Sequence, residues 1–170
     1  MQKEDFRNNV FVHRNKMYRF ALSYLKNDEE AQDVVQEVLM KLWETRRELN
    51  QIENIEAWCM TLTRNKSLDA LKRAGKKRNE TLEVKHEANH LTNRDPLSIV
   101  EEKQSVSMVK KLADELPEKQ KSAFILREIQ GYSYLEISEI MEVPMNQVKV
   151  NIHRARKSIK EELQKYLSYE

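Results

Sequence analysis

Residues 131–160 read GYSYLEISEIMEVPMNQVKVNIHRARKSIK, and their turn and capping residues decide the fold of this part of the chain. Gly131 follows a helical pattern and is suited to end it. Ser133 and Glu136 have the spacing of a capping box, in which each side chain bonds to the backbone of the other at a helix start. We expect a short helix there, and Pro144 to open a long final helix. A short helix, a tight turn and a longer helix form the helix-turn-helix pattern.

The final helix is predicted to have two chemically different sides at about 100° per residue. One side is apolar and is expected to pack on the preceding helices: Met145, Val148, Ile152, Ala155, Ile159, Leu163 and Tyr166. The other side carries Asn146, Lys149, Val150, His153, Lys157 and Lys160, with Arg154 at its edge. No acidic residue follows Glu142 until after Lys160. A recognition helix needs such donors for base edges and cations for phosphates, so we interpret this side as a DNA-reading surface.

A solvated basic helix face is common and is the alternative interpretation of this pattern. The capped short helix and tight turn directly before the basic helix favour DNA binding. The net charge of +2 does not itself indicate a polyanionic partner, so the interpretation depends on how the charge is distributed.

Glycine and proline are rare, at 2 and 3 of 170 residues, so long uninterrupted helices are expected. Hydrophobic residues make up 39% of the chain, which is enough for small helical cores but little for one large core. We predict an all-α fold with two small helical domains joined by a flexible linker, the C-terminal one containing the helix-turn-helix. The predicted segments are an N-terminal domain over 1–75, a polar linker without clear periodicity over 76–96, and a C-terminal domain over 97–170.

Within the N-terminal domain, Asn27 or Asp28 is suited to cap a helix with an apolar stripe, and another helix is expected from about Ile55. In the C-terminal domain, helices are expected after Pro96 and from Pro117 to the residue before Gly131.

Cys59 is the only cysteine, so no disulfide can form within the chain, which fits a reducing compartment. We expect it to pack in the core. The first 16 residues are charged throughout and lack the apolar segment of a signal peptide. No apolar run is long enough to span a bilayer, so we expect a cytoplasmic protein that is not itself in the membrane.

The sequence has no glycine-rich phosphate loop and no plausible set of nucleophile, base and orienting residue. His86 and His90 are four residues apart, but the further ligands that a structural zinc site needs do not accompany them. We therefore expect no catalytic residues, no metal site and no cofactor, and a protein that is not an enzyme.

Two blocks of the sequence together resemble the bacterial sigma factors of the extracytoplasmic-function (ECF) group, the smallest members of the sigma-70 family. DVVQEVLMKLW (33–43) and AWCMTLTRNKSLDALKR (57–73) resemble the family's second region. Residues 116–163 resemble its fourth region, most recognisably in GYSYLEISEIM (131–141) and HRARK (153–157). An isolated helix-turn-helix occurs in many repressors and is a weak signal, whereas these two blocks in this order, with a linker between them, are a strong signal of the family.

The resemblance implies an RNA polymerase sigma factor of the bacterial cytoplasm, which binds core polymerase and directs promoter recognition and DNA melting for transcription initiation. It implies that the helix of the second region docks on the clamp helices of the largest polymerase subunit. The residues assigned to this contact are Asp33, Gln36, Glu37 and Lys41. The alternative for these residues is plain solvent exposure.

The resemblance also implies that the second region binds the melted minus-10 element. The residues assigned to it are Asn65, Arg64, Lys66, Lys72 and Arg73. The loop RRELNQIEN (46–54) matches the family's loop that receives the extruded base. Base flipping costs a few kcal/mol, so several contacts are needed to offset it. This loop has no aromatic residue to stack on the base, so the resemblance does not identify the base.

For the fourth region, the resemblance implies contact with duplex minus-35 DNA. Together with the outward side of the final helix, it assigns Asn146, Gln147, Lys149, Val150, His153, Arg154 and Lys157. Two departures stand out. Glu142 occupies a turn position that is often glycine and is strained if its φ is positive. NQVKVN (146–151) replaces the frequent GTVKSR, so the promoter sequence cannot be transferred, and Val150 offers a contact to a thymine methyl.

By resemblance, the regulatory partner is an anti-sigma factor, which in this family is often membrane-bound and clamps the two domains together. Three other functions are compatible with parts of the sequence. A dimeric helix-turn-helix regulator would bind a palindrome without polymerase. A helical interaction module would use its basic helix on an acidic partner. A recombinase with a helix-turn-helix tail would need a catalytic constellation that the sequence lacks.

Overall fold

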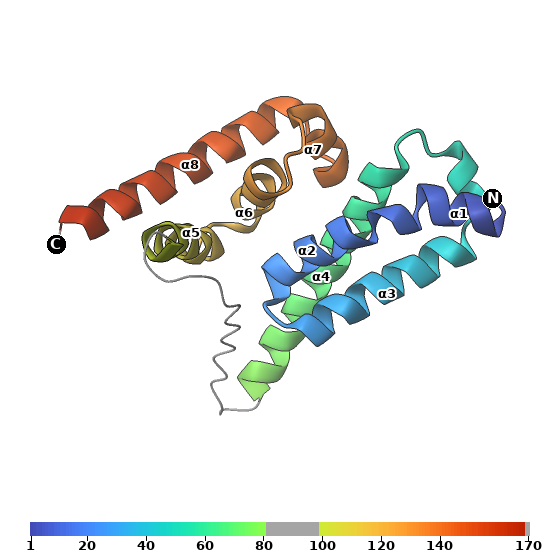
Figure 1. Ribbon diagram of the computed structural model, residues 1–170, viewed down its shortest axis with the longest axis horizontal. Coiled ribbons are helices and arrows are strands. Elements are labelled where there is room, and N and C mark those ends of the chain that lie inside the picture. The colour runs from blue at the N-terminus through green and yellow to red at the C-terminus, as the bar shows by residue number, and fades with distance from the viewer. Residues whose placement is uncertain (81–98, 169–170) are drawn as a thin grey trace. The chain divides into compact units, whose positions relative to one another are not determined.

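The computed structural model describes residues 1–80 and 99–168, and these residues form helices and turns with no strand among them (Figure 1). The all-α prediction is therefore confirmed. The helices group into two compact units, one containing α1 to α4 and the other containing most residues from α5 onward. Among the described residues, no helix is both long enough and apolar enough to cross a membrane.

The first unit is built from four α-helices and two short 3-10 turns. They are α1 (Lys3–Asn9), η1 (Phe11–His13), α2 (Arg14–Leu25), α3 (Asp28–Glu44), η2 (Glu48–Gln51) and α4 (Ile55–Glu80). The turn between α2 and α3 shows why the helices divide there. Lys26 has a left-handed backbone (φ 56°) and ends α2, and the Asn27 side chain accepts a hydrogen bond from the Glu30 amide at 3.0 Å. Of the two predicted candidates, Asn27 is thus the N-cap.

The core of this unit lies where α2 contacts both α3 and α4. Its largest fully buried side chains include Met17, Phe20, Leu42 and Met60. Cys59 is also fully buried, which confirms its predicted core position, and burial raises the pKa of its thiol to about 12.

Helix α4 continues to Glu80, so residues 76–80, which we assigned to the linker, are helical. The physical reason is that Gly75 lowers helix stability by only about 1 kcal/mol, and the residues after it include no proline. Residues 81–96 of the expected linker, with His86 and His90, lie outside the described residues.

The helices from Ile99 onward are α5 (Ile99–Asp114), α6 (Glu118–Phe124), a π-helical turn η3 (Ile125–Ile129), α7 (Tyr134–Met141) and α8 (Met145–Ser168). They form the second unit, except for Ser138–Glu142 at the end of α7, which group with the first unit. The expected helix from Pro117 to Gln130 is present, but its last turn widens, because the Gln130 amide bonds to the Ile125 carbonyl at 3.1 Å. Gly131 ends it with φ 78°, as expected.

Helix α8 packs on α5 and α6 through its predicted apolar side. Val148, Ile152, Ala155 and Ile159 are buried, and Leu163 packs against the cluster formed by Leu112, Ala113, Leu116, Phe124, Ala155 and Ile159. For two residues of the predicted apolar side, the expected packing on neighbouring helices was wrong. Met145 is 42% exposed and Tyr166 is 54% exposed. They belong to the first and last turns of the helix, and Tyr166 lies beyond Leu163, the last side chain that packs on the cluster among those that the structure describes.

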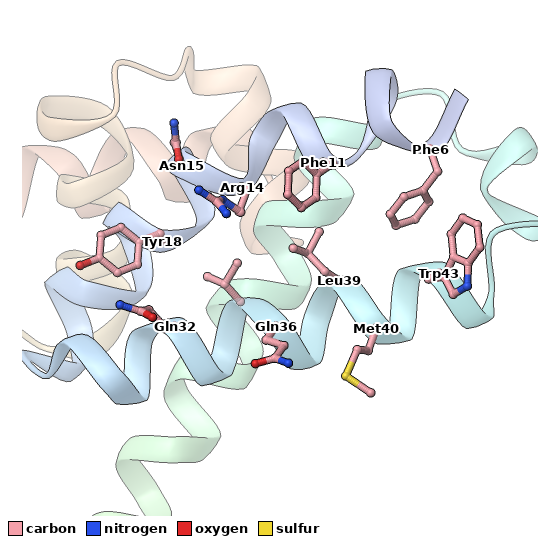
Figure 2. A pocket seen from close by; sticks show the side chains of 11 residues that line it. Phe6, Phe11, Arg14, Asn15, Tyr18, Gln32, Gln36, Leu39, Met40 and Trp43 are labelled. Atoms are coloured by element: carbon pink, nitrogen blue, oxygen red, sulfur yellow. The ribbon is translucent and has the colours of Figure 1, made fainter. Parts of the chain in front are cut away.

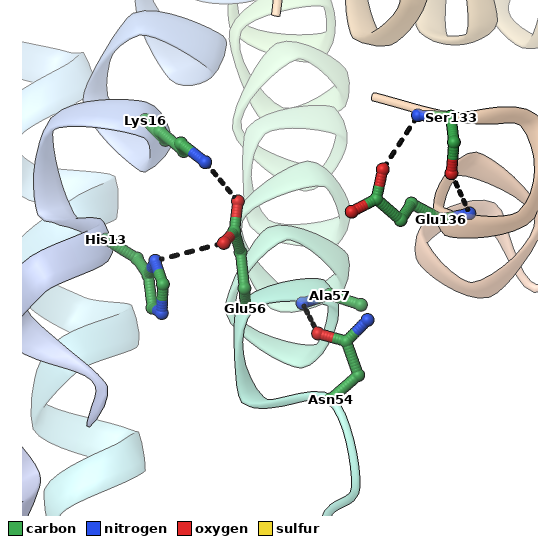
Figure 3. A network of polar contacts seen from close by, with 7 residues as sticks. All are labelled: His13, Lys16, Asn54, Glu56, Ala57, Ser133 and Glu136. Carbon is green, nitrogen blue, oxygen red and sulfur yellow. Dashed lines mark hydrogen bonds and ion pairs between the residues drawn. The ribbon is translucent and has the colours of Figure 1, made fainter. Parts of the chain in front are cut away.

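The turns around α7 also follow the sequence prediction. The Glu136 amide donates to Ser133 Oγ at 3.2 Å, and the Ser133 amide donates to Glu136 Oε2 at 2.7 Å, so the capping box is formed (Figure 3). Between α7 and α8, Glu142 has φ 55°, the left-handed conformation that glycine adopts at less cost.

We expect Glu142→Gly to raise the free energy of unfolding by up to about 1 kcal/mol, because it relieves the left-handed strain. Gly131→Ala is the matched control. A Cβ at Gly131 would meet no atom within 4 Å, so only its positive φ opposes the change, and a loss of about 1 kcal/mol is expected. Denaturant unfolding followed by circular dichroism measures both, and a stability loss in Glu142→Gly would contradict the strain.

Candidate functional site

The outward side of α8 gathers the predicted DNA-binding side chains on one surface. Asn146, Gln147, Lys149, Val150, His153, Arg154 and Lys157 are all exposed. Within the described parts of the chain, Lys149, His153 and Arg154 form neither an ion pair nor a side-chain hydrogen bond. Lys157 is 3.9 Å from Glu161, one turn further along. The surface therefore presents donors that no carboxylate in the first two turns neutralises.

Arg156 lies on the same helix but has a different role. Its guanidinium Nε donates to Glu128 Oε1 at 2.8 Å, and this bond raises the pKa of Arg156. Arg156 thus ties α8 to η3, whereas Arg154, two residues earlier, is exposed and makes no such bond within the described part of the chain. The sequence alone does not separate these two arginines, because the partner of Arg156 is 28 residues away.

An apolar groove of about 770 Å³ opens between the α1–α2 segment and α3 (Figure 2). Its apolar lining is Phe6, Phe11, Val35, Leu39, Met40 and Trp43, and its polar lining is Arg14, Asn15, Tyr18, Gln32 and Gln36. Phe11 is 44% exposed and Met40 is 57% exposed. Exposed apolar side chains gathered in a groove with polar residues beside them are typical of a protein-binding site.

Trp43 lies at one end of the groove and is held from two sides. The Phe6 ring meets it edge to face at a centroid distance of 5.0 Å. The Arg46 guanidinium lies 4.2 Å from the centre of the Trp43 ring and also donates to the Trp43 carbonyl at 2.8 Å. Trp43 therefore connects the groove with the first residue of the loop 46–54.

The four side chains expected to contact polymerase are all exposed on α3, but only Gln36 lines the groove. Glu37 is engaged by Lys66 of α4, whose Nζ lies 2.8 Å from Glu37 Oε2. Asp33 and Lys41 share the Glu37 side at intervals of four residues. Sequence reasoning missed Phe11, Leu39, Met40 and Trp43 as residues of this groove. The available signal was the presence of large apolar residues on α3 beyond its buried stripe.

The five minus-10 candidates on α4 divide into separate rows. Asn65 and Lys72 are seven residues apart and lie on one row, and Lys66 and Arg73 lie on the next. The second row faces Glu37, since the hydrogen bond from Lys66 lowers the pKa of Glu37 and the Arg73 charge lowers it further. Arg64 and Lys66 are half-buried, while Asn65, Lys72 and Arg73 are exposed.

The loop 46–54 is fixed at its far end by the start of α4 (Figure 3). Asn54 Oδ1 accepts from the Ala57 amide at 3.0 Å and caps the helix. Glu56 accepts a hydrogen bond from Lys16 Nζ and lies 3.5 Å from His13 Nδ1. Burial lowers the pKa of His13, and this effect outweighs the opposing effect of the Glu56 carboxylate. Within the loop, the turn η2 buries Leu49, so the expected polar loop has an apolar anchor.

Among the described residues, no group of three His, Cys, Asp or Glu side chains is placed to hold a metal ion.

Comparison with known proteins assigns both units to one family. Residues 11–77 match Sigma-70 region 2, and residues 107–159 match Sigma-70, region 4. The chain is 30% identical over 158 residues to the RNA polymerase sigma factor SigV of Bacillus subtilis, covering 90% of this chain and 87% of that protein. It is 28% identical over 159 residues to the ECF RNA polymerase sigma factor SigE of Mycolicibacterium smegmatis, covering 94% of this chain but only 62% of that protein.

Solved structures show the same fold. The sigma factor RpoE, in complex with the anti-sigma factor NepR from Bartonella quintana, superposes with a TM-score of 0.74 at 24% identity, covering 95% of this chain and 98% of that one. CnrH, in complex with the cytosolic domain of CnrY, gives a TM-score of 0.64 at 19% identity, covering 96% and 90%. The chain therefore belongs to the sigma-70 family, in its ECF group of RNA polymerase sigma factors, which act in transcription initiation. This confirms the resemblance found in the sequence.

The His13–Glu56 contact gives a pH prediction. The pKa of His13 is expected below 6.5, and Glu56→Gln should lower it further, because the carboxylate favours the protonated imidazole. The neutral form is favoured in the folded state, so stability is lost as pH falls through 6.5 and below. Histidine NMR titration, with the His13 signal assigned from a His13→Gln variant, measures the shift. A higher His13 pKa in Glu56→Gln would contradict this account.

Proposed function

We propose that this protein binds core RNA polymerase and directs it to promoters with two elements, reading a duplex minus-35 element with α8 and a melted minus-10 element with α4 and the loop 46–54. The observation that carries the proposal is the exposed side of α8, which has no acidic residue between Met145 and Lys160 and lies opposite the buried side of the same helix. In this proposal the protein is a specificity subunit, and RNA synthesis belongs to the polymerase.

At the minus-35 element, α8 enters the major groove with its N-terminal turns. Asn146, Gln147, Lys149, Val150, His153, Arg154 and Lys157 form the proposed contact set. Asn and Gln pair well with adenine, and Arg and Lys pair well with guanine. Cations further along the helix bind phosphates and fix the register on the duplex.

The groove beside α3 is the proposed docking site for polymerase. Its large exposed apolar side chains would be covered by a partner helix, and helix-in-groove binding uses such anchors. Gln36 lies within the groove, and the charged row Asp33, Glu37 and Lys41 forms the adjacent rim. This arrangement extends the contact set that the sequence suggested and adds Met40 and Trp43 as proposed apolar anchors.

The minus-10 strand is proposed to follow α4. Asn65 and Lys72 present one row of donors, and Arg64, Lys66 and Arg73 lie beside it. Binding of single strands combines such cations with sites for unstacked bases. The loop 46–54, held at Arg46 and at Asn54, is the proposed receiver of the extruded base.

The segments 1–75, 76–96 and 97–170 correspond in this proposal to region 2, a linker and region 4. An anti-sigma factor is the proposed regulatory partner. Support for it comes from the two similar solved structures, which are a sigma factor with an anti-sigma factor and CnrH with the cytosolic domain of CnrY. The proposal places the protein in the bacterial cytoplasm, with any membrane attachment supplied by that partner.

The test is transcription in vitro from a genomic fragment library, using purified core polymerase with and without this protein. New start sites that share two spaced upstream elements are expected. Failure to produce new starts, together with failure to bind core polymerase, would overturn the proposal and favour a dimeric regulator that binds a palindrome.

We expect Met40→Asp to weaken binding to core polymerase at least about tenfold, because a charge replaces an exposed apolar anchor of the groove. Leu71→Asp on α4 is the matched control, since Leu71 is an exposed apolar residue outside the groove and the same charge is introduced. Fluorescence polarisation with labelled protein measures both affinities. Equal losses in the two variants would show that the groove is not the docking site.

A second pair of variants tests α8. Arg154→Ala should lower initiation from minus-35-dependent promoters by roughly tenfold, while binding to core polymerase is unchanged. Arg156→Ala should lower initiation less than about twofold, because its guanidinium is bound to Glu128. Single-round transcription and polymerase binding are measured for both variants. A larger effect of Arg156→Ala would contradict the assignment of the outward side.

A further inference from the structure

Of the exposed residues proposed to contact DNA, Val150 and Lys157 point most directly away from the buried side of α8, and Val150 is the one in the first two turns. At about 100° per residue, Val150 lies about 170° from the mean direction of the buried residues Val148, Ile152, Ala155 and Ile159. Asn146, one turn before, lies about 40° to one side of Val150, and Arg154, one turn after, lies about 40° to the other side. His153 lies about 60° from Val150, on the same side as Asn146. Val150 is 46% exposed.

Val150 does not belong to the buried side through which α8 packs. A single exposed aliphatic residue is ordinary on a protein surface, so exposure alone carries no argument. The position is what matters, because Val150 is the centre of a surface whose other members are polar or basic. A β-branched residue also forms helix less readily than lysine, glutamine or alanine, so an exposed helical position gains nothing from it.

The chemistry of valine restricts what the centre of this surface can recognise. Its two methyl groups cannot bind a phosphate or hydrogen-bond to a base edge. The major groove offers one apolar group for contact, the 5-methyl of thymine. The side chain is short, so contact requires the second turn of α8 to lie deep in the groove, which is the docking geometry of a recognition helix.

We propose that Val150 selects thymine at one position of the minus-35 element through contact with the thymine 5-methyl group, with Asn146 and Arg154 hydrogen-bonding to the neighbouring base pairs. The inference rests on the proposed function and gives it a specific chemical content. The element recognised by this protein contains a thymine whose methyl group, and not its hydrogen-bonding edge, is read.

Replacement of thymine by uracil removes only that methyl group and tests the inference directly. The template is a promoter recovered from the genomic library, with each minus-35 thymine of either strand replaced in turn by uracil. Initiation is measured with the full-length protein and core polymerase. We expect one uracil template to initiate about three- to fivefold less well than its thymine parent, the size expected for one buried methyl group.

The variant Val150→Ala should then initiate equally from the thymine and uracil templates at that position. Val150→Thr, which keeps the branch and one methyl group, should retain part of the difference. Arg154→Ala is the matched control, because it should lower initiation from both templates and preserve their ratio.

Two outcomes would overturn the inference alone while the proposed function stands. In one, no minus-35 uracil affects initiation by the unaltered protein, which would make Val150 a solvated residue only. In the other, Val150→Ala retains the full thymine-to-uracil ratio. If the library yields no promoter and the protein fails to bind polymerase, the proposed function and this inference fall together.

Discussion

The packing of α8 through one side only is the constraint on which the second unit depends. One side is buried against neighbouring helices, and the opposite side is left exposed. Val148, Ile152, Ala155 and Ile159 are the buried side chains that hold the helix. Because successive residues of a helix point in different directions, this stripe leaves the opposite side with no packing role. The ion pair between Arg156 and Glu128 adds a polar tie. The proposed minus-35 surface is the side of α8 that packing leaves exposed.

In the first unit, α3 is also buried on one side, but its other sides are not purely polar. One side of α3 is buried against α2 and α4, yet large apolar side chains also line the groove beside it. Two contacts connect this groove and its charged rim with the proposed minus-10 surface. Trp43 stacks under Arg46 at the start of the loop 46–54, and Glu37 pairs with Lys66 of α4. An exposed ion pair contributes about 0–1 kcal/mol, so its members can exchange partners at small cost when polymerase or DNA arrives.

Local rules predicted the parts of the structure that depend on neighbouring residues. The Asn27 cap, the box formed by Ser133 and Glu136, the helix end at Gly131 and the buried stripe of α8 all follow from spacings of a few residues. The outcome for Met145 and Tyr166 differed, because helical spacing gives the direction of a side chain but not how far the neighbouring helices extend. The π turn at Ile125 was likewise not encoded in any motif that we recognised.

The candidate sites were harder to predict than the helices. The pairing of Glu37 with Lys66 joins residues 29 positions apart, and the sequence had assigned them to two separate interfaces. The groove needs side chains from α1, η1, α2 and α3 together, so no single stretch of sequence reveals it. What the sequence could supply was the family and the outward side of α8, since both are properties of continuous segments.

The buried position of Cys59 has a practical consequence. It is the only cysteine in the chain, and with a thiol pKa of about 12 it carries almost no thiolate near neutral pH. A single cysteine introduced at an exposed position would therefore react with maleimide dyes or spin labels without removal of the natural one. Pairs of such positions, one in each unit, would let energy transfer report the distance between the units as polymerase, promoter or a regulatory protein is added. Because Cys59 is buried, labelling experiments can start from the natural sequence without replacing its cysteine.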